Sequence, residues 1–436
     1  MTALIPAVVG IVVILAGIGL SIGAHEFGHL IPAKIFNVRV PRYMIGFGPM
    51  LWSRTIGETE YGLKLLPFGG YCRMVGMVPP APEGRVEKNT FFGNVMADAR
   101  EESVKEILPG EENRAFFNLS APRKIVVMAG GIFANFLMSI LFTVLAFSIG
   151  FTQATPVVSA ISDCIPTADG TPCNAATDPA PAAAAGLQPG DRVVSFDGHA
   201  VSSWTDMTNA IDGTAGHAVP VVVERDGQEL TLTVTPQQVT RAVLDAEGNP
   251  VTQDGQIETV TSAFVGLAPT FARQSVPMAE VPSQVGQMFT GTAGMVVTFP
   301  VQVYRVAHDM FTGTPRGDDS VMSVVGVGRA AVDVASADVD VLDRVAVMLS
   351  LVASLNMALF VFNLVPLLPL DGGHVLNAIY EGVKRTVARV RGVTPLPGPA
   401  DVARTLPIAY VMVVVLVLST VLLVLADVID PVSIFQ

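Results

Sequence analysis

The sequence predicts a polytopic α-helical membrane protein with four transmembrane helices, and three observations carry this prediction. Half of the 436 residues are hydrophobic, only 15% are charged, and the mean hydropathy is +0.53. Four apolar runs are long enough to cross a bilayer, which takes about 20 residues. These runs cover residues 3–24, 125–150, 345–368 and 406–426. The polar segments between the runs alternate in charge, as the loops of a multi-pass protein do.

The distribution of charge predicts the orientation in the plasma membrane. Residues 31–124 carry 13 Lys and Arg, whereas residues 151–342 carry 7 Lys and Arg against 21 Asp and Glu. Because short loops rich in Lys and Arg stay in the cytoplasm, residues 31–124 and 371–404 are predicted inside. The acidic segment and both chain termini are then outside. The net charge of −12 argues against nucleic acid as a partner.

The first apolar run has a second interpretation, a cleaved signal peptide. No Lys or Arg precedes the run, and it is longer than a typical signal core. Residues 21–24 resemble a cleavage site only weakly. We therefore expect this run to remain as a membrane helix.

Three ionisable residues follow that uncharged run. His25 and His29 are four residues apart, so their imidazoles project from one helix face, one turn apart. Both can reach one tetrahedral metal ion, and Glu26 can take a proton from a metal-bound water. The alternative is a pair of helix-capping histidines with a surface glutamate. More than 20 uncharged residues precede these groups, and charge at membrane depth is costly, which favours the metal site.

A third metal ligand is expected after the third apolar run. A catalytic zinc commonly has three protein ligands and keeps a fourth position for water. Asp371 follows two prolines, which break the helix, and precedes Gly372 and Gly373, which let the backbone turn close to a metal. With four spans, Asp371 and the histidine pair lie at the cytoplasmic ends of two helices running the same way. His374 is the rival ligand, and we favour Asp371 because His374 would face away.

Residues 39–74 are rich in Gly and aromatic residues and predict a β-hairpin. Residues 52–55 and 61–66 have strand composition around a turn at Gly57 and Glu58. An exposed strand edge near a membrane site can pair with an unwound substrate segment. A hairpin that only packs on the helices is the alternative, and the sequence leaves both open.

Residues 181–240 resemble a PDZ domain of the kind attached to bacterial proteases. The motif Gly186-Leu187-x-x-Gly190-Asp191 precedes a strand-like run, and residues 219–224 and 229–235 read as further strands. Residues 204–211 predict a short helix between them. PDZ domains bind peptides by strand addition. The groove can serve as a peptide site or as a size filter, and both readings stay open.

Two further features of the predicted outside segment bear on topology and compartment. Cys164 and Cys173 can form a local disulfide in an oxidising compartment, and two free thiols are the alternative. Residues 285–304 are apolar enough for a fifth span, but their polar residues favour a surface-lying amphipathic helix. A fifth span would also put Asp371 on the opposite side of the membrane from the histidines.

Asn135 lies within the second apolar run. An Asn in lipid seeks a polar partner across a helix interface, and we expect a structural role for it. Cys72 is predicted inside as a small packed residue. The polar stretch 79–118 contains a helical charge pattern and carries no recognisable chemistry.

Taken together, these motifs resemble the site-2 proteases, which are intramembrane zinc metalloproteases. The resemblance rests on the PDZ-like insert and on two motifs, His25-Glu26-x-x-His29 and Asn363-x-x-Pro366-x-x-Pro369-Leu370-Asp371-Gly372. Gly69-Gly70-Tyr71 is similar to the family's membrane-associated hairpin region. One PDZ domain with four helices resembles bacterial regulators of extracytoplasmic sigma factors. The Pro/Ala-rich, Lys-poor composition suggests an actinobacterial member.

The resemblance implies the same chemistry as the residues. His25, His29 and Asp371 would hold Zn²⁺, and Glu26 would act as general base and then as general acid. By analogy with the family, Asn363 would hold the substrate strand, and Gly69 and Gly70 would lie at the substrate-binding hairpin.

The implied substrates are single-span membrane proteins, such as anti-sigma factors already shortened outside the cell. The lipid bilayer and a peptide ligand of the PDZ groove are the other expected partners. Two alternatives remain: a catalytically inactive PDZ-bearing membrane scaffold or chaperone, and a metal-dependent lipid hydrolase. An inactive relative would be expected to have lost Glu26 or a metal ligand, and this sequence keeps all of them, which favours the protease.

The expected organisation follows the chain in nine parts. They are a first transmembrane helix with the metal motif (1–30), a cytoplasmic loop with the membrane-associated β-hairpin (31–124), a second transmembrane helix (125–150), a linker (151–180), an extracytoplasmic PDZ domain (181–240), an extracytoplasmic region with an amphipathic helix (241–342), a third transmembrane helix with Asp371 (343–374), a cytoplasmic loop (375–405), and a fourth transmembrane helix with a tail (406–436).

Overall fold

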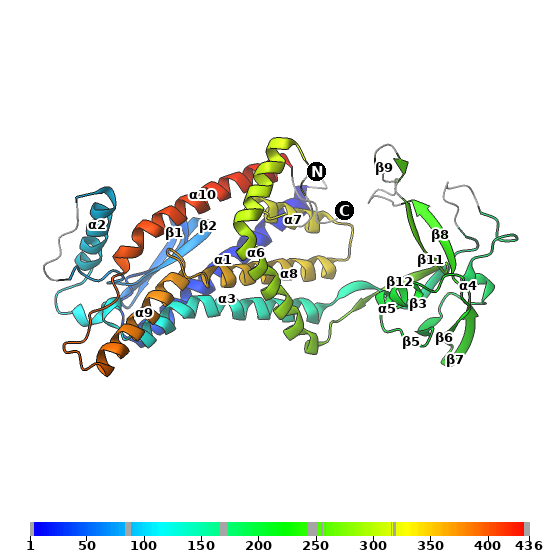
Figure 1. Ribbon diagram of the computed structural model, residues 1–436, viewed down its shortest axis with the longest axis horizontal. Helices are drawn as coiled ribbons and strands as arrows, with labels where there is room; N and C mark the ends of the chain where they lie inside the picture. Colours follow the sequence, from blue (N-terminus) through cyan, green and yellow to red (C-terminus); the bar gives the residue numbers. More distant parts are fainter. Residues whose placement is uncertain are drawn as a thin grey trace. The chain divides into compact units, whose positions relative to one another are not determined.

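The computed structural model forms two compact units (Figure 1). Unit 1 comprises Met1–Ile149 and Val276–Ile434, and unit 2 comprises Gly150–Ser275. The structure describes residues 4–82, 89–165, 173–242, 252–253, 256–257, 259–314, 316 and 320–430.

Among the described residues, four helices of unit 1 are long and apolar enough to cross a membrane. They are α1 (Leu4–Ile35), α3 (Ala121–Ile149), α8 (Val341–Asn363) and α10 (Leu406–Ile429). These helices cover the four apolar runs of the sequence. The first three run alongside one another in Figure 1, and their shared core includes Ile14, Ile18, Phe142 and Val352.

Helices α1 and α3 touch through their backbones. A Cβ placed on Gly28 would lie 2.3 Å from the Gly130 oxygen, and one on Gly130 would lie 2.1 Å from the Gly28 oxygen. Small residues permit this approach between membrane helices. Helix α1 also continues beyond the expected boundary at residue 30, so the motif with His25 and His29 lies inside the helix rather than at its end.

The segment expected as the third transmembrane helix, residues 343–374, contains the helix break that its two prolines predict. Helix α8 ends at Asn363, and Asp371 begins a separate helix, α9 (Asp371–Val390), which occupies much of the expected loop 375–405. The intervening prolines lack an amide hydrogen and cannot continue a helix. The loop folds back tightly on the start of α9. A Cβ on Gly372 would lie only 2.4 Å from the Val365 oxygen, so the close approach requires glycine.

Strands β1 (Arg42–Ile56) and β2 (Thr59–Arg73) pair antiparallel around the turn at Gly57 and Glu58, and both are longer than the sequence suggests. The hairpin packs on α1, where the Tyr43 hydroxyl donates to the Gly23 oxygen at 2.7 Å. Large apolar side chains, among them Leu51 and Trp52, are exposed on it.

Buried ion pairs hold α2 (Phe91–Lys105) and α9. The short helices of the neighbouring segments are η1 (Glu112–Arg114), η2 (Phe116–Asn118) and η4 (Val402–Thr405). Arg100 of α2 contacts Asp401 at 2.7 Å, and Lys124 of α3 contacts Glu381 of α9 at 2.6 Å. Arg100 is only 5% exposed, so α2 is anchored to the loop before α10 rather than fully solvated.

Helix α6 (Val281–Thr312) is not among the four candidate spans. It follows η3 (Met278–Glu280), precedes α7 (Val324–Ser336), and packs against α3, α8 and α10. The rings of Phe299 and Phe362 lie 6.0 Å apart, and Val306 packs on Leu423. The amphipathic helix that the sequence predicts is therefore also packed against membrane helices.

Unit 2 is built on a sheet of six strands in the order β12-β3-β4-β6-β7, with β5 paired to β4. Its elements are β3 (Phe151–Ile161), α4 (Pro181–Ala184), β4 (Arg192–Phe196), β5 (His199–Ala200), α5 (Trp204–Ile211), β6 (Val219–Arg225), β7 (Gln228–Val234) and β12 (Leu267–Gln274). Two smaller pairs are β8 (Gln237–Ala242) with β11 (Thr259–Phe264), and β9 (Thr252–Gln253) with β10 (Gln256–Ile257).

Two boundaries of this unit differ from the expectation. Residues 151–180 are not only a linker, because β3 pairs with both β4 and β12 and buries Val158 in the core. The unit also extends past residue 240 to include β12. A strand contributed from each side of the expected domain completes the sheet. The structure joins Cys164 to Cys173 by a disulfide within this unit, whereas Cys72 is a free thiol.

A charged contact holds the turn before β4 of unit 2. Arg225 donates from Nε to Asp191 Oδ1 at 2.6 Å and from Nη2 to Oδ2 at 2.8 Å, and the Gln188 amide donates to Oδ2 at 2.8 Å. The Arg225 guanidinium holds the pKa of the Asp191 carboxyl below its usual value. The ionised carboxylate therefore stabilises the folded unit.

We expect Asp191→Ala to increase amide hydrogen exchange in β4 and β6 of the full chain about tenfold or more, because three hydrogen bonds to the carboxylate are lost. Glu229→Gln, at an exposed position on β7, is the control. The folded-state pKa is lowered, so the contribution of Asp191 is complete above about pH 4 and is lost as the pH falls further. Equal exchange in both variants at pH 7 would contradict this.

Candidate metal centre

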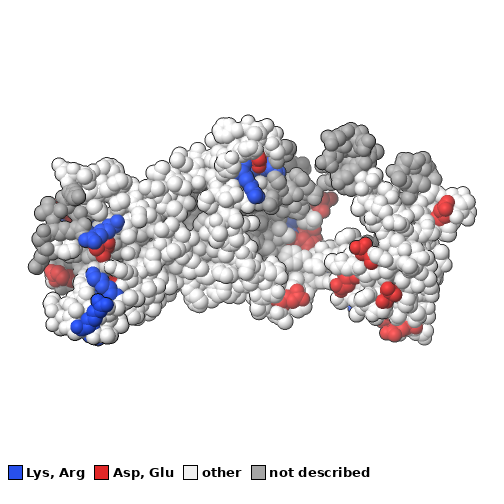
Figure 2. All heavy atoms as spheres, viewed as in Figure 1, with Lys and Arg blue, Asp and Glu red and all other residues white. Residues whose placement is uncertain are grey.

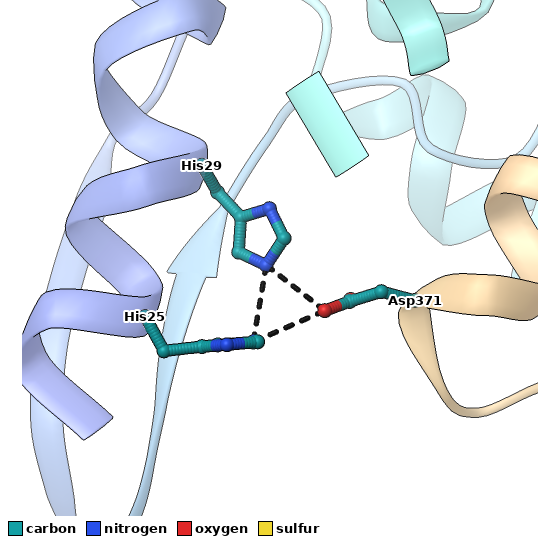
Figure 3. A group of neighbouring side chains, drawn as sticks. All are labelled: His25, His29 and Asp371. Carbon is teal, nitrogen blue, oxygen red and sulfur yellow. Dashed lines mark hydrogen bonds and ion pairs between the residues drawn. The ribbon is translucent and has the colours of Figure 1, made fainter. Parts of the chain in front are cut away.

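Three side chains of unit 1 converge on one point (Figure 3). His25 and His29 come from α1, and Asp371 comes from the start of α9. The Nε2 atoms of the two histidines are 3.2 Å apart, and Asp371 Oδ2 lies 3.1 Å from His25 Nε2 and 3.2 Å from His29 Nε2. All three side chains are largely buried.

The neighbouring helix α3 sets the orientation of both imidazoles. His29 Nδ1 lies 2.9 Å from the Val127 oxygen, and His25 Nδ1 lies 3.1 Å from Asn135 Oδ1. Both partners are acceptors, so each Nδ1 carries the proton and each Nε2 presents its lone pair. Gly131 leaves room for the His29 ring, because a Cβ there would lie 2.3 Å from Nε2.

The resulting cluster requires a cation. Two Nε2 lone pairs and a carboxylate oxygen face one another within 3.2 Å, without a proton between them when both rings are neutral. Zinc bonds of about 2.0–2.1 Å in tetrahedral geometry place ligand atoms about 3.3 Å apart. The three observed separations match this value, and two His with one carboxylate are a donor set that zinc accepts.

Glu26 lies beside this cluster, and His25, His29 and Asp371 are its nearest charged groups. Strand β2 lies against Glu26. The strand approaches the Glu26 side chain closely at Gly70, where an added Cβ would lie 3.3 Å from Glu26 Cγ. Burial, with the Glu26 carboxylate nearby, raises the pKa of the Cys72 thiol to about 12, so this thiol stays neutral.

The other candidate residues are not in the cluster. His374 contributes no ligand atom to it and lines a small cavity with Lys124 and Glu381. The Asn363 amide donates to the Leu359 oxygen of its own helix at 3.0 Å. Gly69 has a φ of +88°, and a Cβ there would lie 2.2 Å from the Phe47 ring. The hairpin therefore needs this glycine for its own packing.

Sequence reasoning did not assign Asn135 to the metal site. Asn135 was expected to find a polar partner across a helix interface, and the structure shows that this partner is His25. The spacing of Asn135 relative to His25 carries no signal, because the two residues are 110 positions apart. The one sequence signal is that Asn135 is a polar residue within an apolar run, where polar residues often mark a functional site.

The comparison with known proteins agrees with this geometry. Residues 13–394 match peptidase family M50. The chain belongs to this family. It is 30% identical to zinc metalloprotease Rip1 of Mycobacterium tuberculosis over 442 residues, which cover 98% of this chain and 99% of the relative. It is 26% identical to zinc metalloprotease RasP of Geobacillus kaustophilus over 412 residues, covering 83% and 86% of the two chains.

Family membership identifies the protein as a multi-pass intramembrane metalloprotease of the site-2 type, with zinc as its cofactor. Family membership therefore confirms the enzymatic activity that the sequence predicts, and it agrees with the four candidate membrane helices. The match covers α1 and α9, the elements that carry the clustered side chains.

We expect His29→Ala and Asp371→Ala to lose zinc. Removing a group that hydrogen-bonds to a metal ligand weakens metal binding about 10–100-fold. Removing the ligand itself should weaken zinc binding by more than that. Zinc content of the protein purified in detergent, together with competition by a chelator, measures this. His308→Ala and Asp338→Asn change exposed residues away from the cluster and serve as controls. Wild-type zinc affinity in Asp371→Ala would rule out the carboxylate as a ligand.

Proposed function

We propose that this protease cleaves single-span membrane proteins within their membrane segments, after a first cut outside the cell has shortened them. Anti-sigma factors are the proposed substrates. The observation that carries the proposal is the meeting of His25, His29 and Asp371 on two helical elements of the membrane unit, beside Glu26. A hydrolytic site among membrane helices suits a peptide bond that lies in the bilayer.

The proposed roles follow the chemistry of the side chains. His25, His29 and Asp371 hold the zinc ion, which when bound lowers the pKa of its water to about 7 and polarises the scissile carbonyl. Glu26 accepts the proton of the attacking water and later passes it to the leaving amine. Strand β2, which lies against Glu26 at Gly70, holds this side chain beside the site.

The β-hairpin is the proposed docking site for the substrate. A helical segment buries its carbonyls in internal hydrogen bonds, so the substrate must unwind before it is cut. An unwound segment can pair with a strand edge, and β2 lies against Glu26 at Gly70. We assign Asn363, Gly69 and Gly70 to this docking step. The exposed Leu51 and Trp52 support contact of the hairpin with lipid.

Unit 2 is the proposed PDZ domain. It contains a sheet with α5 placed in sequence between β5 and β6, and its core gathers Phe196, Met207 and Val221. A PDZ groove can bind a peptide by strand addition, and a bulky domain outside the cell can exclude substrates with intact ectodomains. Both roles suit a protease that acts after a first cut.

The proposed orientation places the metal cluster toward the cytoplasm and unit 2 outside, with both termini outside. Figure 2 shows Lys and Arg side chains, with some Asp and Glu, at the end of unit 1 near α2 and α9, further Lys and Arg near α6, and Asp and Glu side chains on unit 2. The excess of Lys and Arg in residues 31–124 supports this assignment. A disulfide in unit 2 suits an oxidising compartment.

We expect Glu26→Gln to keep its zinc and to cleave a single-span test substrate about 10²–10⁴-fold more slowly, because only the proton acceptor is lost. Purified protein in detergent, with and without a chelator, tests this. Glu101→Gln, on exposed α2, should cleave at the wild-type rate.

Two outcomes of that experiment would contradict the proposal. Equal cleavage by wild type and Glu26→Gln would remove Glu26 as the base. A wild type that binds zinc and leaves every single-span substrate intact would favour a membrane scaffold or a lipid hydrolase.

The orientation has its own test by thiol labelling. Glu229→Cys lies on exposed β7 of unit 2, and Lys384→Cys lies on exposed α9. A membrane-impermeant maleimide should label the first in intact cells and the second only after permeabilisation. The wild-type chain, whose Cys164 and Cys173 are bonded, provides the background. Labelling of Lys384→Cys in intact cells would reverse the orientation.

A further inference from the structure

A group of polar residues is buried among the apolar faces of α1, α3 and α8, next to the metal cluster. Ser21, Asn135, Ser139 and Asn356 are each 0% exposed. Within the described residues, three of their polar atoms have no hydrogen-bond partner: Asn135 Nδ2, Ser139 Oγ and Asn356 Oδ1. Buried polar atoms are nearly always paired with protein or ordered water, so this concentration calls for an explanation.

The packing of the helices places these residues in two adjacent layers. Helices α1 and α3 are antiparallel, because His29 contacts Val127 while His25 contacts Asn135. Ser21 precedes His25 by one helical turn, and Ser139 follows Asn135 by one turn, so both serines lie one layer further from His29. Asn356 of α8 joins this layer, since its Nδ2 donates to Ser21 Oγ at 2.8 Å.

The unpaired atoms are complementary. Asn135 Nδ2 is a donor, Asn356 Oδ1 is an acceptor, and the Ser139 hydroxyl can do either. The remaining capacity of Asn356 is used, because its Nδ2 also donates to the Val352 oxygen at 2.8 Å. A buried water typically makes about three hydrogen bonds to otherwise unsatisfied groups. One donor, one acceptor and one hydroxyl are such a set.

We propose that Asn135 is a positioning residue for His25, and that a water bound by Asn135 Nδ2, Ser139 Oγ and Asn356 Oδ1 fixes its amide. This inference rests on the proposed role of His25 as a zinc ligand. The chain His25–Asn135–water–Asn356–Ser21 then links the metal centre to all three helices of the core.

The orientation of the Asn135 amide decides the tautomer of His25. With Oδ1 toward the ring, Nδ1 keeps its proton and Nε2 offers its lone pair to the metal. With Nδ2 toward the ring, the proton would move to Nε2 and face the site. A water that accepts from Nδ2 stabilises the first orientation, and such partners of metal-binding histidines influence affinity.

The same chain fixes α1 against α8. Ser21 precedes His25 by one turn on α1, and α8 leads through its following loop to Asp371. A hydrogen bond between side chains of two apolar helices disfavours sliding, because a shift breaks it. The bond from Asn356 to Ser21 thereby holds α8, from which the loop leads to Asp371, in register with α1.

Zinc affinity of the full chain in detergent, measured by chelator competition, tests the positioning role without any substrate. We expect Asn135→Leu to weaken zinc binding about 10–100-fold. Asn135→Asp keeps the acceptor for His25 Nδ1 and should restore the affinity. Thr143→Val removes a buried hydroxyl on the same helix, one turn beyond Ser139, and should match the wild type.

The visible spectrum of the Co²⁺-substituted protein gives a second readout. A changed ligand geometry at His25 shifts the absorption bands in Asn135→Leu, whereas Asn135→Asp and Thr143→Val keep bands near those of the wild type. Wild-type zinc affinity in Asn135→Leu, or equal losses in Asn135→Leu and Asn135→Asp, would overturn the positioning role.

A double-mutant cycle tests the water link. If the water acts on the metal through Asn135, Ser139→Ala alone should weaken zinc binding, because the Ser139 hydroxyl has no hydrogen-bond partner within the described residues. Adding Ser139→Ala to Asn135→Leu should then have little further effect. Additive losses would overturn the link. Because these measurements use no substrate, a failure of the proposed proteolysis leaves them unaffected and is recognised separately.

Discussion

The structure depends on one electrostatic constraint, the meeting of three hydrogen-bond acceptors at a single point in a membrane protein. Two imidazole lone pairs and a carboxylate repel one another unless a cation lies between them. The fold still brings them to about the separation that tetrahedral zinc requires. A zinc ion held by these three side chains would stabilise this end of the helix core and would also supply the reactivity of the proposed site.

Holding that cluster in place requires close contact between backbones. Gly28 and Gly130 let α1 and α3 touch, which brings Val127 within reach of His29 and Asn135 within reach of His25. Lipid offers no partner to a polar side chain, so such a side chain is stabilised by partners inside the helix core, as His25 is by Asn135. The polar residues that serve the metal thereby also specify how the helices pack.

Strand β2 connects this rigid core to the part of the molecule that meets a substrate. Its glycines allow it to lie against α1 beside Glu26, and its other face belongs to a hairpin with exposed apolar side chains. Glu26, the proposed proton acceptor, and the proposed docking edge thus both adjoin one strand. A substrate strand paired with the hairpin would already lie next to the cluster, without a further conformational change.

The sequence by itself determined the four spans and the histidine pair, because hydropathy and the spacing of four residues along a helix are local properties. Tertiary structure decided the rest. It brought Asp371 Oδ2 within 3.2 Å of both histidines, paired Asn135 with His25, and placed β3 in the sheet of unit 2. These pairings join residues far apart in the chain, and only the packing of whole elements brings them together.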